Sequence, residues 1–282
     1  MKKSNDDQGT LLKKQLVPSI KILESFISKL RNKQAFGSFF LVAISLLGVI
    51  ALAFWAQYRG ALGIPRNDDW VYLHMADWLA SSGQFVVESG SLTNASGQIF
   101  LSQPIIWIFG NNIAALQIFV ALLGVIGILA TWVIVRTFLS VSISILVLLT
   151  MVLSPFWATL SLSFMTDIPA FTFQALALMF LLKASGKQGL NWIWIAVSLA
   201  FALLAFSIRE YAIAAGMTVL LFICLNGLKT SRKNFYISLV VGFVWLFVAY
   251  GLYQWRSHLN NAVVSPPALS RSDVAGAIVQ FT

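Results

Sequence analysis

Long stretches of sequence without a charged residue most constrain what this chain can fold into. About 20 helical residues cross the ~30 Å hydrocarbon core of a membrane, and shorter spans occur where a helix end is buried in protein. The pattern therefore predicts an all-α, polytopic transmembrane helix bundle of about seven spans. The charge-free stretches are residues 34–58, 89–135, 137–166, 168–182, 188–208, 211–228 and 234–255. The predicted spans lie near residues 39–58, 113–135, 141–160, 168–182, 191–208, 211–227 and 235–253.

The composition excludes the common water-soluble classes. Only 10% of the 282 residues are charged and 59% are apolar, whereas a soluble domain has about 25% charged residues. The single cysteine can form neither a disulfide framework nor a cysteine-based zinc site. An ordinary soluble enzyme, a disordered protein and a disulfide-stapled secreted domain are therefore excluded, and an integral membrane protein remains.

The basic residues predict the orientation and the domains. Residues 1–38 form an arm with eight Lys and Arg side chains, which the positive-inside rule keeps in the cytoplasm. Residues 39–253 are the expected transmembrane module, and residues 254–282 an outer-face segment that we expect to be truncated. The predicted location is the plasma (inner) membrane. The arm is expected to contact anionic lipid headgroups and no nucleic acid, because it lacks interleaved aromatic residues.

The first outer loop, residues 59–112, carries an acidic pair. Asn67 is a suitable N-cap for a juxtamembrane helix that begins at Asp68 and Asp69 and ends near Ser82, with Gly83 as the residue after it. Capping alone would explain the two aspartates. The pair, however, follows directly on the first span, on the side where most acidic residues of the chain are predicted to lie.

A second part of the same loop is apolar but does not have the length of a span. Ile99–Phe109 is too short to cross a membrane, and we expect Pro104 to interrupt it. The segment is therefore predicted to be interfacial or re-entrant.

Two further outer features lie at predicted span ends. Pro169 suits the first turn of a helix, so Thr166 or Asp167 is its expected N-cap. Arg209 and Glu210 lie between two spans with almost no loop. An arginine there can offer two donors to a phosphate. The alternative for Asp167 is a helix cap only, and the alternative for Arg209 and Glu210 is a topological charge with its local partner.

Two motifs resemble those of the C-type (GT-C) glycosyltransferases. They are Asp68-Asp69-Trp70-Val71-Tyr72 after the first span and Met165-Thr166-Asp167-Ile168-Pro169 at a later helix start. The chain most resembles the dolichyl-phosphate-mannose protein mannosyltransferase and aminoarabinose-transferase-like family, in which the commoner residue at the place of Asp69 is Glu. Residues 102–110 are also similar to that family, and the whole chain resembles its N-terminal part.

The resemblance implies a membrane enzyme that transfers a sugar from a polyprenyl-phosphate donor to a hydroxyl acceptor on a glycan, a lipid or a protein. The reaction is expected on the outer (periplasmic) face. Asp68 is then the general base or the carboxylate that positions the acceptor, with Asp69 as its support. The implied site residues are Asp68, Asp69 and Asp167 for catalysis, Arg209 and Arg66 for the donor phosphate, and Tyr72, His74 and Glu210 for weak substrate contacts.

The sequence alone leaves open whether the site holds a metal ion, and it allows two other functions. A divalent cation, Mg²⁺ or Mn²⁺, held by Asp69 and Asp167 is one alternative, and a site without metal is the other. A polytopic transporter or flippase of a lipid-linked or anionic substrate is an alternative function, although transporters keep ionisable groups near the bilayer midplane on repeated halves. A non-catalytic membrane scaffold is the second alternative function.

Overall fold

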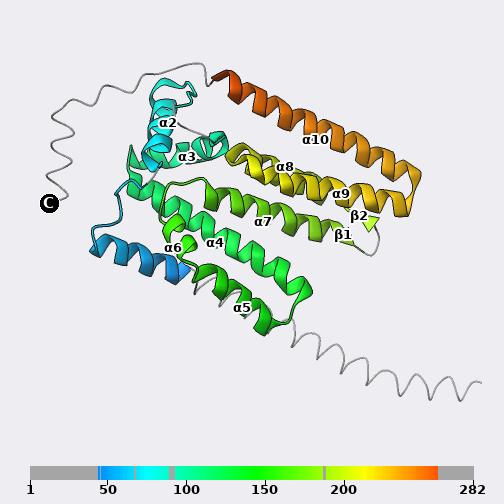
Figure 1. Ribbon diagram of the computed structural model, residues 1–282, viewed down its shortest axis with the longest axis horizontal. Helices are drawn as coiled ribbons and strands as arrows, with labels where there is room; N and C mark the ends of the chain where they lie inside the picture. Colours follow the sequence, from blue (N-terminus) through cyan, green and yellow to red (C-terminus); the bar gives the residue numbers. More distant parts are fainter. Residues whose placement is uncertain (1–43, 45, 67, 89–92, 187–188, 260–282) are drawn as a thin grey trace, which may run out of the picture. The chain divides into compact units, whose positions relative to one another are not determined.

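The computed structural model describes residues 44, 46–66, 68–88, 93–186 and 189–259 (Figure 1). The predicted arm 1–38, Asn67 and residues 260–282 lie outside the described residues. The prediction that Asn67 is the N-cap is wrong, because Asp68 occupies the N-cap position of the helix Asp69–Ser82. The chain divides into two compact units, Met1–Gly48 and Val49–Thr282. The second unit contains all the candidate site residues.

The predicted all-α class is confirmed. The first described helix is Leu46–Tyr58. It is followed by α2 (Asp69–Ser82), α3 (Ser96–Phe109), α4 (Ile113–Phe138), α5 (Val141–Val152), α6 (Pro155–Ser161), α7 (Asp167–Ala184), α8 (Trp192–Ile208), the 3₁₀ turn η1 (Glu210–Ala212), α9 (Ile213–Thr230) and α10 (Arg232–Leu259). Between α7 and α8, β1 (Ser185–Gly186) and β2 (Gly189–Leu190) pair antiparallel, with Ser185 opposite Leu190.

Four of these helical stretches are long and apolar enough to cross a membrane. They are α4, α7, the continuous stretch Glu210–Thr230 and α10. A fifth is present if α5 and α6, which meet at 57°, form one bent span. Leu46–Tyr58 and α8 are apolar but shorter; the 17 residues of α8 span about 26 Å at 1.5 Å per residue. Helices thus form within all seven predicted segments, and seven crossings stay a prediction.

The helix surfaces and contacts are those of a membrane protein. Large apolar side chains point outward along α10, where Phe243 is 73% exposed and Phe247 is 69% exposed. Soluble monomers rarely expose large apolar side chains in a continuous patch along a helix. Inside the bundle, small residues bring helices close: a Cβ on Gly127 of α4 would lie 2.7 Å from Thr172 Oγ1 of α7. The Thr172 hydroxyl donates to the Leu123 carbonyl at 2.9 Å.

The helix predicted to end near Ser82 is confirmed as α2, and Gly83 follows it with a left-handed φ of 70°. Its place at the membrane surface stays a prediction. The prediction that Pro104 interrupts the next segment is wrong, because Pro104 lies inside the helix α3. A proline there removes the backbone hydrogen bond to the Phe100 carbonyl, but the buried residues Ile99 and Ile106 of α3 pack in the same cluster as α2 and α4, which holds the helix together. With 14 residues, α3 reaches about 21 Å, which agrees with a segment too short to cross.

A buried apolar cluster joins α2 and α3 to α4 and to the start of α7. Its members include Val71, Tyr72, Met75, Ile99, Leu116, Val120, Phe164 and Ile168. The end of α10 is attached to the same region, because the Phe85 ring stacks on Trp255 with 5.4 Å between ring centroids. The core therefore holds α2 and α3 against the ends of the long helices.

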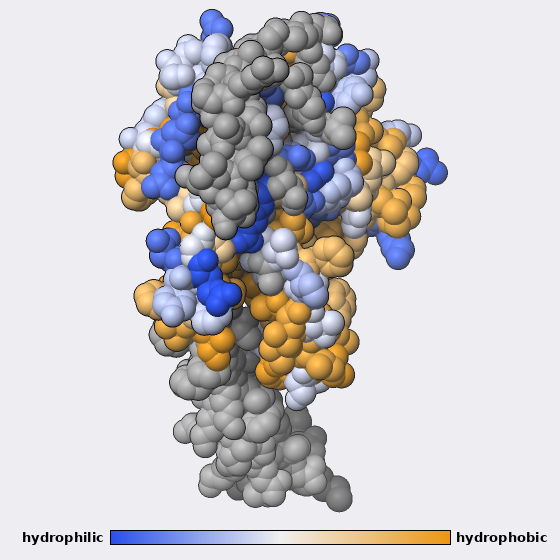
Figure 2. Space-filling view, turned by 60° about the vertical axis from the view of Figure 1, so that its left-hand side comes forward, coloured by the Kyte–Doolittle hydropathy of each residue, from blue (hydrophilic) through white to orange (hydrophobic). Residues whose placement is uncertain are grey.

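Charges predicted for opposite membrane sides lie at opposite helix ends. Asp167 begins α7 and Lys183 lies in its last turn, about 24 Å apart along the axis. Figure 2 turns the left-hand side of Figure 1, where α2 lies, toward the viewer. It shows hydrophilic side chains (blue) set between areas of hydrophobic ones (orange). Which side of the membrane this end faces stays a prediction.

Candidate functional site

Asp68 and Asp69 begin α2 but lie in different surroundings. Asp68 occupies the N-cap position, makes no side-chain capping hydrogen bond and is exposed. Asp69 is completely buried, with 0% of its surface exposed. The Asp68 side chain does not cap α2, so helix capping does not account for this residue. The pair consists of one accessible carboxylate and one enclosed carboxylate.

The buried Asp69 carboxylate is surrounded by hydrogen-bond donors. Its Oδ2 accepts from the backbone N–H of Arg66 at 3.2 Å and from Gln117 Nε2 at 3.4 Å. Burial raises the pKa of Asp69 above its ordinary value, whereas the backbone amides of Phe164 and Arg66, the Gln117 amide and the charge of Arg66 act to lower it. Among the described residues, Oδ1 has no hydrogen-bond partner.

Gln117 of α4 fixes the turn that leads into α2. Its Oε1 accepts from the Gly63 N–H at 2.9 Å, and its Nε2 donates to the Ile64 carbonyl at 3.0 Å. The same Nε2 reaches Asp69. One buried side chain of α4 therefore binds residues 63 and 64 as well as the start of α2.

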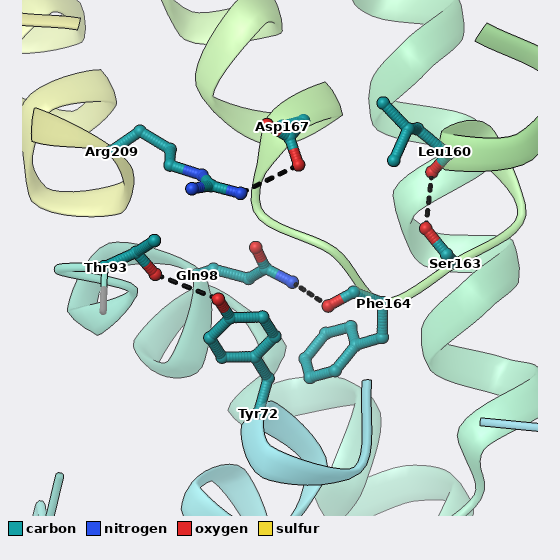
Figure 3. Close-up of polar contacts among 8 residues, drawn as sticks. All are labelled: Tyr72, Thr93, Gln98, Leu160, Ser163, Phe164, Asp167 and Arg209. Carbon is teal, nitrogen blue, oxygen red and sulfur yellow. Dashed lines mark hydrogen bonds and ion pairs between the residues drawn. The ribbon is translucent and has the colours of Figure 1, made fainter. Parts of the chain in front are cut away.

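Asp167 and Arg209 form an ion pair (Figure 3). Arg209 Nη2 donates to Asp167 Oδ2 at 2.9 Å, and the two side chains are 20% and 29% exposed, respectively. Arg209 has extended backbone angles, with φ −141° and ψ 132°, between α8 and η1. A charge-assisted bond of this length is stronger than a neutral one. The structure thus brings together two residues that the sequence identified separately.

The segment that leads into α3, residues 94–96, holds the end of α8 in place beside Arg209. Carbonyls in the last turn of a helix have no partner within it, and three of them in α8 accept from this segment. The bonds run from Asn94 Nδ2 to Phe206 O at 3.4 Å, from Ala95 N to Ile208 O at 3.0 Å, and from Ser96 Oγ to Ser207 O at 3.0 Å. The backbone position of Arg209 is therefore set by residues 94–96.

Gln98 connects this segment to the loop between α6 and α7 (Figure 3). The side chain is completely buried, and its Nε2 donates to the Phe164 carbonyl at 2.8 Å. The backbone amide of Phe164 also acts on Asp69, whose pKa it lowers, and Phe164 lies three positions before Asp167. Both acidic groups of the site are therefore linked through the backbone around Phe164.

The other sequence-predicted site residues have contacts of their own. Arg66 is half-buried, and its Nη2 donates to the Ala61 carbonyl at 3.2 Å. Tyr72 is 1% exposed and its hydroxyl lies 3.0 Å from Thr93 Oγ1. The roles predicted for both residues, in donor binding and in substrate contact, stay predictions.

His74 and Glu210 lie apart from these contacts. His74 Nδ1 is 2.6 Å from Oε2 of the buried Glu88, a partner that the sequence did not indicate. Glu210 is half-buried in η1, next to Arg209. Their predicted substrate contacts stay predictions too.

The comparison with family models decides the family. The model for the dolichyl-phosphate-mannose-protein mannosyltransferase family matches residues 99–255, which is more than half of the 282 residues. The chain belongs to this family. Searches of curated proteins and of solved structures found no match to the chain.

Membership of the mannosyltransferase family confirms the resemblance deduced from the motifs. Together with the apolar helices, it makes the chain an integral membrane glycosyltransferase that uses a polyprenyl-phosphate-linked sugar. The matched range contains Asp167 and Arg209, whereas Asp68 and Asp69 precede it. The family match therefore covers the ion pair but leaves the roles of the first two aspartates to the geometry.

A metal site was one alternative for this mannosyltransferase-family chain. In the part of the chain that the structure describes, no group of three or more His, Cys, Asp or Glu side chains is placed to hold a metal ion. Asp167 is bonded to the Arg209 guanidinium, which competes with a cation for the same oxygen. Metal binding by Asp69 and Asp167 stays a prediction.

An apolar groove, here called the α8–α10 groove, lies between two helices of the matched region. A cavity of about 560 Å³ is lined by α3, α8 and α10, including Ser96, Leu203, Ser207 and Trp255. A second cavity of about 360 Å³ continues between α8 and α10 and shares Leu203 with the first. Because the lining residue Val240 is 63% exposed, the groove opens on the outside of the helices.

Sequence reasoning missed the uncharged polar residues of the site. They are Asn94, Ser96, Gln98 and Gln117, which are all buried. A signal was present, because all four lie inside the charge-free stretch 89–135, and a buried amide or hydroxyl must find a hydrogen-bond partner. Each of the four bonds to at least one backbone group distant in sequence, which no local pattern identifies.

Proposed function

We propose that this protein transfers a sugar from a polyprenyl-phosphate donor to a hydroxyl group of a glycan, lipid or protein acceptor, on the outer (periplasmic) face of the membrane. The family supports the donor class and the transferase activity. The observation that carries the site assignment is that one buried cluster holds the start of α2 together with Phe164 and Ile168, which lie on either side of Asp167, the partner of Arg209. Asp68, next to Asp69, supplies the exposed carboxylate.

Asp68 is proposed as the general base. The acceptor oxygen bonds to the anomeric carbon while the bond from that carbon to the phosphate oxygen breaks, and the hydroxyl proton passes to the carboxylate. Such proton transfer contributes about 10²- to 10⁴-fold to a rate. Asp68 is exposed and has no capping role, so its carboxylate is accessible to a hydroxyl group. The buried Asp69 fixes the start of α2 and thereby the position of Asp68.

Arg209 is proposed to stabilise the departing polyprenyl phosphate, whose negative charge grows as the sugar leaves. Positively charged donors aimed at developing charge are a major source of rate enhancement. Asp167 orients the guanidinium through its 2.9 Å bond. At 20% exposure, Arg209 can be reached by a lipid phosphate. Arg66, whose charge acts on Asp69, is a second proposed cation for the phosphate.

The α8–α10 groove is the proposed place of the isoprenoid chain of the donor. Its lining is almost entirely apolar, and at one end it includes Ser96 and Ser207, close in sequence to Gln98 and Arg209. An isoprenoid chain in this groove would therefore end near the arginine proposed to bind its phosphate. An occupant of this kind fits because it is both apolar and already in the membrane.

A transfer assay in proteoliposomes tests the proposed function. The protein is mixed with polyprenyl-phosphate sugars and candidate acceptors, and mass spectrometry identifies the products. We expect transfer by the wild type and a loss of about 10²- to 10⁴-fold in Asp68→Asn. Asp77→Asn is the matched control, because Asp77 is a partly exposed acidic residue on the same helix.

Two outcomes would contradict the proposal. Full transfer by Asp68→Asn would remove the proposed base, and movement of a lipid-linked substrate across the vesicle membrane without any transfer product would favour a flippase.

A further inference from the structure

We propose that Gln98 is a positioning residue that sets the Asp69 carboxylate and the Asp167–Arg209 pair in their relative places. The proposal rests on the proposed function, because its main measurement is sugar transfer. Gln98 precedes the residues that the family model matches. It was not among the residues that the sequence indicated.

The position of Gln98 relative to Arg209 is fixed by close packing. Gly97, the preceding residue, lies so near α8 that a Cβ on it would be 2.2 Å from Ser207 Oγ and 2.9 Å from Ile208 Cγ1. Ser96, one residue earlier, donates to the Ser207 carbonyl. The first turn of α3 therefore cannot shift without moving the end of α8, to which Arg209 is attached.

The side chain of Gln98 transmits this placement to the loop between α6 and α7. Its Nε2 donates to the Phe164 carbonyl at 2.8 Å, and the Phe164 side chain packs in the same buried cluster as Val71 and Tyr72 of α2, next to Asp69 in the chain. Ser163 is bonded to Leu160, within its own part of the chain. The Gln98 bond thus ties the loop to α3, an element far away in sequence.

The second end of the Gln98 carboxamide indicates a role beyond holding the fold. Among the described residues, Gln98 Oε1, Thr166 Oγ1 and Arg209 Nε are buried polar atoms without a hydrogen-bond partner. Buried polar atoms in proteins are nearly all bonded. Figure 3 shows the amide oxygen on the side of Arg209 and Asp167, while the amide nitrogen points to Phe164. One end of Gln98 holds the loop, and the other faces the ion pair.

The test is kinetic and uses the full chain in proteoliposomes. Gln98→Met keeps the length of the side chain and removes the donor. Ser198→Ala is the matched control, because Ser198 is also completely buried and donates to a distant carbonyl, that of Ala177 at 2.6 Å. The kcat of transfer, the KM for the polyprenyl-phosphate sugar and the melting temperature are measured for each variant.

The expected result separates positioning from simple stability. Gln98→Met should lower kcat about 10- to 100-fold, because small displacements of catalytic groups have effects of this size, with less than about a threefold change in KM. Ser198→Ala should have about the same melting temperature as Gln98→Met, and its kcat should stay within about twofold of the wild-type value. In an Asp69→Asn background, Gln98→Met should have a smaller effect, because the two residues act through the same loop.

Other outcomes would overturn the proposal. Equal losses of kcat in Gln98→Met and Ser198→Ala would show that Gln98 affects transfer only through the stability of the fold. An unchanged kcat in Gln98→Met would show that Gln98 does not position the site. If that variant does not fold, Gln98→Asn, whose shorter amide cannot reach Phe164, is expected to show the same loss. Absence of transfer by the wild type would refute the proposed function, whereas transfer that Gln98→Met retains would refute the role of Gln98 alone.

Discussion

Arg209 Nη2 lies 2.9 Å from Asp167 Oδ2, so the residue that follows α8 is bonded to the residue that begins α7. The partners are 42 positions apart and meet at the end of the bundle where α2 and α3 pack. Residues 94–96 bind the end of α8, next to Arg209. The loop between α6 and α7, which contains Phe164, leads directly to Asp167. The pair is therefore a junction between the helices and the loop.

Replacement of Arg209 should reduce activity far more than stability. The pair is partly exposed, and such pairs contribute about 1 kcal/mol or less to stability. Arg209→Ala is expected to lower sugar transfer about 100-fold or more, with only a small change in melting temperature. Arg209→Lys should retain part of the activity, because lysine keeps the charge but loses the forked donor geometry.

The comparison of activity and melting temperature checks this prediction. A variant that melts much earlier but transfers at the wild-type rate would show that the pair serves the fold alone.

Asp69 should make stability depend on pH in a defined direction. Burial raises its pKa in the folded protein, so the folded state binds this proton more tightly than the unfolded chain. The resulting stabilisation is fully present below the unfolded value of about 3.9 and is lost as pH rises through the raised folded value. Asp69→Asn cannot ionise, so its melting temperature should fall less than that of the wild type across this range.

Melting curves from acidic to neutral pH test the sign. Parallel curves for the wild type and Asp69→Asn would contradict it.

Gly97→Ala should disturb the contact between α3 and α8. The added methyl group would lie 2.2 Å from Ser207 Oγ, and overpacking of this kind costs about 1–3 kcal/mol. We expect a lower melting temperature and reduced transfer, because Gln98 and Arg209 both adjoin the contact.

Gly251→Ala is the control for that change. Gly251 lies in α10 and a Cβ there would meet nothing within 4 Å, so helix propensity predicts a gain of up to about 1 kcal/mol. Equal effects of the two substitutions would exclude the packing argument.

The orientation can be tested with single cysteines. In a Cys224→Ser background, Asp77→Cys should react with a membrane-impermeant maleimide in intact cells, whereas Ser231→Cys, exposed between α9 and α10, should react only after the cells are opened. The expected pattern follows from the positive-inside rule. The reverse pattern would place the site on the cytoplasmic side.

Much of the local structure could be predicted from the sequence. Gly83 ends α2 because a left-handed residue is needed there, and Pro169 lies in the first turn of α7, as its fixed φ favours. These predictions succeeded because the determining residues are neighbours in the chain. The prediction for Pro104 failed because the packing of α3 in the buried cluster outweighs one missing backbone bond.

The candidate site was predicted only in part. Its charged members stand out in a chain where charge is rare, and Asp167 and Arg209 were both identified in this way. Their pairing was not predicted, and neither were Gln98 and Gln117, because their partners lie 42 to 66 positions away. An uncharged amide in an apolar stretch cannot be identified as a site residue from the sequence, because its hydrogen-bond partners are known only from the fold.

The α8–α10 groove has a consequence for how a substrate reaches the enzyme. Because Val240 and Trp255 leave the groove open at the side, an isoprenoid chain can enter it by lateral diffusion without ever meeting water. Withdrawal from the bilayer would cost about 0.8 kcal/mol for each CH₂ group exposed, and this route avoids that cost. Donor analogues with long and short chains should then bind with similar strength once their concentrations are expressed per unit of membrane, so that chain length determines retention in the bilayer more than recognition by the protein.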